Sequence, residues 1–357
     1  MNDATALEPV AVRRTRADDI DAHTELLGDW DLHYDQLDCG AFEGTFTDVR
    51  WPGMQLFMET TTRRVRQRGS LPAASFSVGT MLAGEGVVSV NGRRSGAGNL
   101  IVGDASELDV CTPAGCTLAG LVVSAQALVE AIEDMSDLTP LLGPGAMLPM
   151  TAPSQWLMPW RSLLSSSLQL AVDTPWRLQD PVVRRRLQDD LLVHVVDAMA
   201  DAQRDDKPQC ADNRRRKRIV DRACDLMLSQ PDEPPSLFDV CRQVGASPRK
   251  LGYCFQEVLG LSPARYLKAM RLNAVRRELG RGDRAGMSVY DAAVRWGFWH
   301  FGHFSADYKK QFSELPSETL NRARSRVRGP GGIFDGLSAH RRDARARQPS
   351  SGERLFV

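Results

Sequence analysis

Short apolar runs separated by Gly, Pro and Asn follow one another from Ala41 to about Ser124. The runs are Gln55–Met58, Ser75–Val78, Val87–Val90, Leu100–Val102 and Leu118–Val123. Their spacing is typical of antiparallel strands, and the pair Asn91-Gly92 directly after one run predicts a tight hairpin turn. This part of the chain is therefore expected to form a small all-β sandwich or barrel.

After Ser124 the apolar positions recur at helical spacing. Three helices are predicted: one from Ser124 with Leu128, Val129 and Ile132, one with Trp156, Trp160, Leu163, Leu164 and Leu168, and one with Leu187, Leu191, Leu192, Val195, Val196 and Met199 on a single face. We expect the third stripe to pair two chains, and packing within the domain is the alternative.

The chain divides at changes of composition. Residues 1–40 are polar with scattered apolar positions and are expected to form a loosely packed arm ahead of a β-rich domain over 41–200. The polar, proline-containing stretch 201–213 is predicted as a linker, and 214–324 as a helical domain. Residues 325–357 are Arg-rich with a Gly-Pro-Gly-Gly start, too polar to fold, so we expect a disordered tail.

A helix-turn-helix pattern occupies residues 235–260. Ser236 can cap a helix that Gly245 ends, and Ser247 can cap a second helix with Pro248 at its first position. The buried side of the second helix is predicted as Leu251, Cys254, Phe255 and Val258, and its outer side as Arg249, Lys250, Gly252, Tyr253 and Gln256. Two helices joined in this way place the second in the major groove of DNA.

A similar pattern returns at residues 287–320. Ser288 is the predicted cap, Gly297 the turn, and the second helix is expected to bury Phe301, Phe304, Tyr308 and Phe312. Its predicted outer side carries His300, His303, Ser305, Lys309 and Lys310. We expect Trp296, Trp299 and the neighbouring phenylalanines to belong to the core.

Residues 262–280 join the two units as one predicted helix. Its apolar stripe is Tyr266, Leu267, Met270, Ala274 and Leu279, and its predicted outer face is Arg265, Lys268, Arg271, Arg276 and Arg277. At about 1.5 Å per residue this helix spans roughly 27 Å. That is close to the roughly 34 Å between successive turns of the major groove, so one chain can dock both units.

The charge distribution favours a polyanionic partner for the second half of the chain. The 45 basic and 45 acidic residues cancel overall, but residues 1–213 hold 17 basic and 30 acidic side chains, whereas 214–357 hold 28 and 15. A basic block of this size attracts nucleic acid. Two surfaces that merely differ in sign are the simpler reading.

Other features of the chain argue against membrane, disulfide and metal chemistry. No run of eighteen apolar residues occurs, and Asp3, Glu8, Asp18 and Asp19 interrupt the first thirty residues, so we expect a cytoplasmic protein without a membrane partner. The seven cysteines are scattered, and we interpret Cys111 and Cys116 as ordinary thiols, with a redox pair as the alternative. His300 and His303 lack suitably spaced further ligands, and the β region lacks a metal-binding histidine cluster.

The paired units and their connector resemble the AraC/XylS family of transcription regulators. The likeness rests on Gly245-x-Ser247, Leu251, Phe255, Gly260-x-Ser262-Pro263, Ala292-Ala293, Gly297-Phe298 and Phe304, over about residues 216–324. Three segments, 253–256, 271–277 and 295–300, most resemble the branch containing the ethanolamine-utilisation regulator. The resemblance implies an α+β fold class: an N-terminal β-rich, cupin-like or jelly-roll domain followed by helices, then an all-α C-terminal domain with two helix-turn-helix units.

The resemblance also implies the residues that contact DNA. Base contacts are expected from Arg249, Lys250, Gly252, Tyr253, His300, Phe301, His303 and Ser305, with Ala306 also at a matching position. We expect phosphate contacts from Arg214, Arg216, Arg218, Ser247, Arg271, Arg276, Arg277, Lys309 and Lys310. Gly252 and Ala306 carry shorter side chains than the family often has there.

These observations predict a sequence-specific regulator of transcription, an activator controlled by a small-molecule effector at its N-terminal domain. The expected partners are double-stranded DNA, RNA polymerase, a second copy of the chain and an effector for which an amine is the candidate. No cofactor, metal or catalytic residue is predicted. The alternatives are a ligand-independent DNA-binding dimer and a cupin-type enzyme fused to a DNA-binding module.

Overall fold

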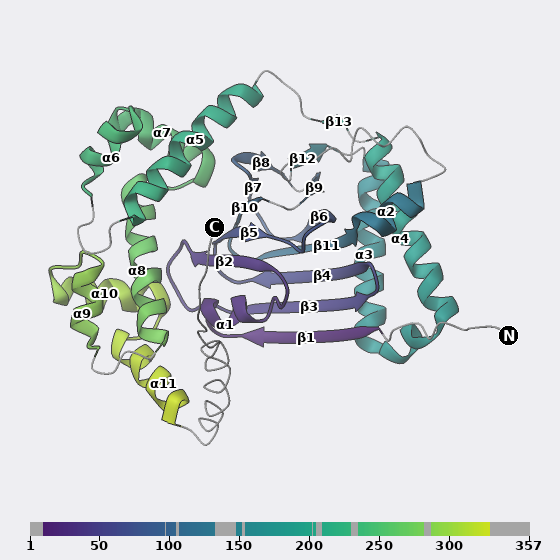
Figure 1. Cartoon of the computed structure of the whole chain (residues 1–357), viewed down its shortest axis with the longest axis horizontal. Helices are drawn as coiled ribbons and strands as arrows, with labels where there is room; N and C mark the ends of the chain where they lie inside the picture. Colours follow the sequence, from purple (N-terminus) through teal and green to yellow (C-terminus); the bar gives the residue numbers. More distant parts are fainter. Residues whose placement is uncertain are drawn as a thin grey trace, which may run out of the picture.

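The computed structural model describes residues 10–96, 98–104, 107–132, 148–151, 154–201, 203–204, 209–229, 235–281 and 287–328. Strands dominate as far as Thr151, apart from the two short helices α1 (Ile20–Glu25) and α2 (Ala125–Ile132). From Ser154 onward the described chain is almost entirely helical. The predicted α+β class with a β-rich first part and a helical C-terminal part is confirmed (Figure 1).

Two antiparallel sheets form the N-terminal domain. The strands are β1 (Ala11–Ala17), β2 (Asp31–Gln36), β3 (Gly44–Trp51), β4 (Met54–Thr61), β5 (Val65–Ser70), β6 (Ser75–Ala83), β7 (Val88–Val90), β8 (Arg93–Ser95), β9 (Asn99–Asp104), β10 (Leu108–Thr112), β11 (Cys116–Ser124), β12 (Leu148–Thr151) and β13 (Gln203–Arg204). The larger sheet has the order β1-β3-β4-β11-β6-β9-β12-β13, and the smaller has β2-β5-β10-β7-β8.

The predicted strands and the predicted hairpin are present. Each apolar run falls within or across one of β4, β6, β7, β9 and β11. Asn91 and Gly92 both have positive φ, 49° and 76°, and join β7 to β8. Positive φ at both central residues is what a two-residue hairpin loop with right-handed strand twist requires.

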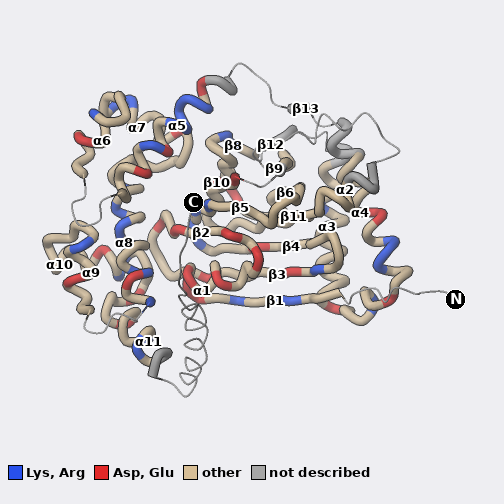
Figure 2. Tube along the Cα trace, in the orientation of Figure 1, with Lys and Arg blue, Asp and Glu red and all other residues tan. Residues whose placement is uncertain are grey.

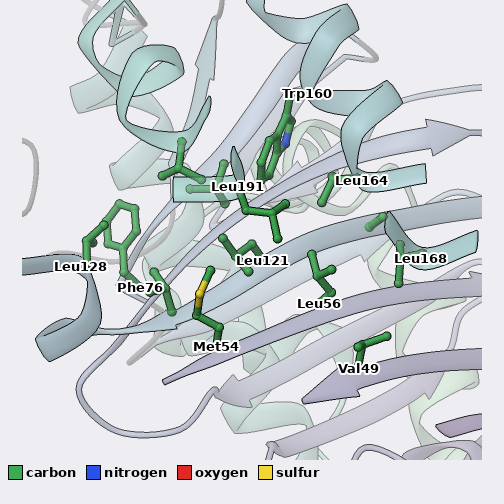
Figure 3. Close-up of a cluster of buried hydrophobic side chains, with 14 of the residues drawn as sticks. Val49, Met54, Leu56, Phe76, Leu121, Leu128, Trp160, Leu164, Leu168 and Leu191 are labelled. Atoms are coloured by element: carbon green, nitrogen blue, oxygen red, sulfur yellow. The ribbon is translucent and has the colours of Figure 1, made fainter. Parts of the chain in front are cut away.

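The larger sheet separates two hydrophobic cores. One face packs on the smaller sheet, burying residues such as Phe46, Val65, Val90 and Val110. The other face is covered by α3 (Ser154–Asp173) and α4 (Pro181–Asp201), which Figure 3 shows contributing Trp160, Leu164, Leu168 and Leu191 above Val49, Leu56 and Leu121. The short 3₁₀ helix η2 (Pro175–Gln179) connects α3 to α4.

The apolar stripe of α4 lies in this core. Leu191, Val195 and Val196 are buried, and Leu187 and Leu192 pack against the same cluster, while the side chain of Met199 is outside the described part. The prediction that this stripe pairs two chains is therefore wrong. A stripe that covers a sheet within its own domain has the same periodicity as one that covers a second copy.

Residues 10–40 are folded, contrary to the predicted loose arm. From residue 10 onward they include β1, α1 and β2, and β1 pairs along its whole length with β3, from Ala11 opposite Arg50 to Ala17 opposite Gly44. Ile20, Leu27 and Trp30 are buried. The strand was not predicted because β1 is an edge strand with mostly polar, half-exposed residues.

The C-terminal domain consists of seven helices among the described residues. They are α5 (Gln209–Leu228), α6 (Leu237–Val244), α7 (Pro248–Leu259), α8 (Pro263–Arg281), α9 (Val289–Arg295), α10 (Phe301–Phe312) and α11 (Pro316–Arg328). Helix α5 begins inside the predicted linker 201–213, and α11 continues four residues into the predicted tail. The rest of that tail lies outside the described residues.

Helix α8 is the central element of this domain. In Figure 1 it runs beside the sheets, with α6, α9 and α10 on its far side. Its N-terminal half contributes Tyr266 and Met270 to the core of the first helix-turn-helix unit, and its C-terminal half contributes Leu272, Val275 and Leu279 to the core of the second. One rigid helix therefore fixes the spacing of the two units.

Candidate nucleic-acid interface

The first helix-turn-helix unit, α6 and α7, is defined by side-chain caps at both helix starts. The Ser236 hydroxyl accepts a hydrogen bond from the Asp239 amide at 3.2 Å, and the Asp239 carboxylate accepts one from the Ser236 amide at 3.3 Å. Gly245 ends α6 with φ of 66°, and Ser247 caps α7 through the Lys250 amide at 3.2 Å. The predicted caps and turn are confirmed.

Helix α7 has the predicted two faces. Leu251, Cys254, Phe255 and Val258 are buried. Arg249, Lys250, Tyr253 and Gln256 are exposed, and Gly252 is partly exposed with nothing within 4 Å of the position a Cβ would take. The outer face of α7 thus offers two cations, a phenol and an amide around an open glycine, which are groups that bind guanine, adenine and phosphate in the major groove.

The second unit, α9 and α10, repeats this construction with different chemistry. Ser288 and Asp291 form the same reciprocal cap, and Gly297 makes the turn with φ of 78°. Helix α10 buries Phe304, Tyr308, Gln311 and Phe312. His300, His303, Ala306, Lys309 and Lys310 are exposed and Ser305 is partly exposed, so every predicted DNA-facing residue of this helix is accessible.

Two aromatic residues of this unit differ from the prediction. Trp299, expected in the core, is 66% exposed, and Phe301, expected on the buried row although also named as a base contact, is 41% exposed. Trp296 does pack inward, where its indole nitrogen donates to Glu278 at 2.8 Å. Trp299 lies just before α10 and Phe301 is its first residue. Both precede Phe304, the first buried residue of this helix, so their side chains lie outside the core.

The predicted outward face of α8 is only partly exposed. Arg265 and Lys268 are exposed, and Arg271 is half-buried, with its pKa lowered by burial. Arg276 is only 4% exposed and Arg277 is partly buried, so the expectation that both face solvent as phosphate contacts is wrong. Their guanidinium groups are turned toward the N-terminal domain.

These two arginines bind three carboxylates of the N-terminal domain, and we call Asp19, Asp21, Asp35, Arg276 and Arg277 the acid–arginine cluster. Arg277 is 2.8 Å from Asp35, and Arg276 is 3.2 Å from Asp21 and 3.7 Å from Asp19. Figure 2 shows the acidic residues along α1 and β2 facing the basic residues of α8. The charge difference between the halves of the chain is thus partly used within the protein.

The pKa shifts in the cluster follow from burial and ion pairing. Burial alone would lower the pKa of Arg276, but Tyr308, Glu314, Asp21 and Asp19 reverse this and raise it. Burial would raise the pKa of Asp35, but a hydrogen bond with His33 and the charges of Arg277 and Arg68 hold it well below its usual range. Both residues are therefore charged at neutral pH.

Further polar contacts join the domains along α8. The Asn273 side chain accepts from the Gln36 amide at 3.1 Å and donates to the Gln36 carbonyl at 2.9 Å, which satisfies the exposed edge of β2. Buried Arg66 binds Asp109 through two hydrogen bonds of 2.8 Å and donates to the Tyr266 hydroxyl at 2.6 Å. No local pattern indicates these contacts, because their partners are 43 to 237 residues apart in the chain.

The basic start of α5 supplies further candidates for phosphate contact. Arg214 and Arg218 are exposed, whereas Arg216 binds Asp212 at 2.6 Å and lies 5.2 Å over the ring of Tyr253. Stacking of Arg216 on Tyr253 fixes the orientation of that ring beside α7. Ser247 is occupied as a cap, although its hydroxyl remains exposed.

The described residues contain no cluster of three or more side chains suited to a metal ion. Cys111 and Cys116 are unpaired and buried in separate cores, and burial raises the pKa of each thiol to about 12. This supports the interpretation as ordinary thiols. Among the residues that the structure describes, no helix has the length and apolar character needed to cross a membrane.

Comparison with known proteins places the likeness in the C-terminal domain. Residues 240–322 match the family model described as a helix-turn-helix domain. Over 102 residues the chain is 41% identical to the "Probable thc operon regulatory protein" of Rhodococcus erythropolis, covering 29% of this chain and 31% of that protein. It is 34% identical over 84 residues to "XylDLEGF operon transcriptional activator 1" of Pseudomonas putida, covering 24% and 25%. The chain therefore matches about a third or less of the length of these curated relatives.

Some solved structures of regulators are similar to about a third of this chain, and others are similar to most of it but at low sequence identity. One, a probable AraC family transcriptional regulator from Rhodopseudomonas palustris CGA009, is 33% identical over 30% of this chain and 98% of its own, with a TM-score of 0.28. The AraC-like activator CuxR is 14% identical over 79% of this chain and 99% of its own, with a TM-score of 0.38. The C-terminal domain of this chain thus contains a helix-turn-helix domain of the matched family, and the relatives to which it is similar are named as regulators of operons or of transcription.

Proposed function

We propose that this protein is a sequence-specific DNA-binding regulator of transcription. The observation that carries the proposal is that α7 and α10 both expose their outer faces while one helix, α8, holds them at a fixed separation. The predicted span of α8, roughly 27 Å, matches adjacent turns of the major groove better than positions within one turn.

Selection from a random duplex library tests this function. Full-length protein should enrich one sequence at physiological salt, and footprinting should find two protected major-groove segments about one helical turn apart for each protomer. Enrichment of no sequence, or protection of a single segment, would contradict the proposal.

We further propose that a small effector binds between the domains. A cavity of about 450 Å³ is lined by Asp21, Glu25 and Asp31 on one side and by Arg276 and Arg277 on the other. The cavity between the two sheets, about 40 Å³, is far below the size of ordinary ligand sites. A ligand in the larger cavity contacts both domains, so its binding would favour one arrangement over another.

The carboxylates of this cavity support an amine or amino alcohol as effector, in line with the resemblance to the ethanolamine-utilisation branch. The carboxylates of Glu25 and Asp31 have neither a hydrogen bond nor an ion pair within the described residues. Ethanolamine should raise the melting temperature of the wild type and have little effect on Asp31→Asn. An equal shift for both proteins would place its binding elsewhere.

Two partners complete the proposal. Names such as transcriptional activator among the relatives support activation through RNA polymerase. A homodimer is supported by the outer side of α4, where Val182 and Val193 are 75% and 55% exposed although the opposite side is buried. Val193→Asp should then convert a dimer to a monomer in sedimentation equilibrium, and an unchanged mass would exclude this face.

A further inference from the structure

The two DNA-facing helices can be compared position by position because they share one frame. In α7 the cap Ser247 precedes buried Leu251 by four residues and buried Phe255 by eight. In α10 the cap position His300 precedes Phe304 and Tyr308 by the same intervals. The frames coincide, so Pro248, Arg249 and Lys250 of α7 correspond to Phe301, Gly302 and His303 of α10.

The same positions carry different chemistry in the two helices. The first turn of α7 exposes two cations, Arg249 and Lys250. From Trp299 to Ala306 the second unit has no lysine or arginine. Its exposed side chains there are mainly aromatic or imidazole, with Trp299 66% and Phe301 41% exposed.

A third aromatic residue supports this surface. Tyr290, at the start of α9, is 58% exposed, and its ring centre is 6.0 Å from that of Phe301. Phe301 also contacts the buried ring of Phe304 at 5.8 Å. Phe301 is therefore held between two rings, which limits its freedom and keeps it at the helix start.

The surface also carries the charge expected of a face that meets DNA. Lys309 and Lys310 are exposed two turns further along α10, while the acidic Asp307 is neutralised by Lys268 at 2.6 Å. The aromatic start would meet base edges while the basic end meets a phosphate strand. This charge arrangement favours DNA over a protein surface as the occupant.

The major groove offers one apolar group, the C5 methyl of thymine, whereas guanine is read chiefly by Arg and Lys. From this contrast we propose that the second unit recognises thymine methyl groups through Phe301 and Trp299, and that the first unit recognises guanine through Arg249 and Lys250. The proposal rests on the proposed function, because it requires both helices to enter the groove. It assigns the two segments of the operator different base compositions.

Thymine replacement by deoxyuridine tests the proposal, since it removes only the methyl group. The probe is the duplex that full-length protein selects from the random library. Positions whose preference is lost in Arg249→Ala define the first segment, and the other protected segment is the second. Each deoxyuridine at a contacted position of the second segment should weaken binding about fourfold, the effect of one buried methyl. Thymines outside both segments are the control and should show no change.

Variants of the protein connect the methyl effect to the aromatic side chains. The double variant Trp299→Ala/Phe301→Ala should bind the thymine and deoxyuridine duplexes equally, whereas Phe301→Leu alone should keep most of the difference. Phe238→Ala is the control, because Phe238 is also an exposed phenylalanine but lies on α6, and it should retain the full difference. Thermal unfolding would verify that each variant is folded.

Three results would overturn the inference while leaving the proposed function intact. They are a selected sequence without thymine in the second segment, deoxyuridine substitutions without effect there, and a Trp299→Ala/Phe301→Ala double variant that still distinguishes the two duplexes. If instead the wild type selects no sequence at all, the proposed function fails and the inference fails with it.

Discussion

Asp35 is fully buried at the junction of the domains, and two guanidinium groups and one imidazole surround its carboxylate. Arg277 is 2.8 Å away, His33 3.3 Å and Arg68 3.4 Å. Removing one partner of a buried ion pair typically costs about 3 to 5 kcal/mol, because the remaining charges lose their compensation. Asp35 should therefore contribute strongly to the stability of the interdomain contact.

Asp35→Asn tests this contribution and its pH dependence. The variant should have a clearly lower melting temperature than the wild type, and Asp31→Asn, exposed on the same strand, should not. The folded-state pKa of Asp35 is held well below its usual value, so its contribution is fully present above that usual value and is lost only as pH falls through the folded-state pKa. The melting difference should thus be the same at pH 7 and pH 5. A difference that vanishes at pH 5 would mean that the carboxylate is already protonated there.

Arg249, on the outer face of α7, is exposed to solvent, unlike Asp35. Arg249→Ala should weaken binding to the selected duplex by about 1 to 3 kcal/mol and relax preference at one base pair. The measurement is a titration of the variant against single-base changes of the selected duplex. An equal loss on random DNA would show that Arg249 contacts phosphate only.

For individual side chains, the sequence predicted which residues of α7 face inward, because apolar and polar positions alternate with the helical period. It did not predict the environment of Arg276 or Trp299. A polar position is compatible with solvent, DNA or an acidic neighbour, and an aromatic position with a core or an exposed binding face. Only the positions of Asp19, Asp21 and Glu314 distinguish these possibilities for Arg276.

The first helix-turn-helix unit contains two glycines that can be compared directly, one at the end of α6 and one inside α7. Gly245 has φ of 66° and Gly252 is helical, and a Cβ at either would meet nothing within 4 Å. Gly245→Ala should therefore destabilise the protein by about 1 kcal/mol, because L-residues disfavour this conformation. Gly252→Ala should stabilise it by about the same amount, because alanine is the better helix former.

Urea unfolding monitored by circular dichroism measures both changes. The two variants differ only in which backbone conformation receives the methyl group, so each is the control for the other. Shifts of the same sign would contradict the assigned end of α6. Gly252→Ala should also reduce DNA affinity, since its methyl points toward the proposed groove.

The elements themselves were predicted with uneven success. Capped amphipathic helices such as α6 and α7, and strands with strong apolar runs such as β11, were found because local chemistry determines them. Strands β1 and β2 were not found, because an edge strand and a strand covered by α8 can keep many polar residues. The face of α4 was misassigned because periodicity does not identify what covers a stripe.

For the whole molecule, the salt dependence of DNA binding separates the roles of its cations. Lys309→Gln should lower the magnitude of the slope of log K against log salt by about one, the value for one lost phosphate contact. Arg277→Gln should leave the slope unchanged, because its charge is engaged by Asp35. A reduced slope for Arg277→Gln would mean that the domains separate on DNA and release this arginine.

Helix α8 spaces the two DNA-facing units and also holds the N-terminal domain through the acid–arginine cluster. Genetic selection for effector-independent transcription should consequently return alleles at Asp19, Asp21 and Asp35, far from any base pair. Such alleles would alter the strength of a promoter response without altering which promoters respond. During evolution, the replacement of one of these three aspartates would change the control of the target genes while the operator sequence stays the same.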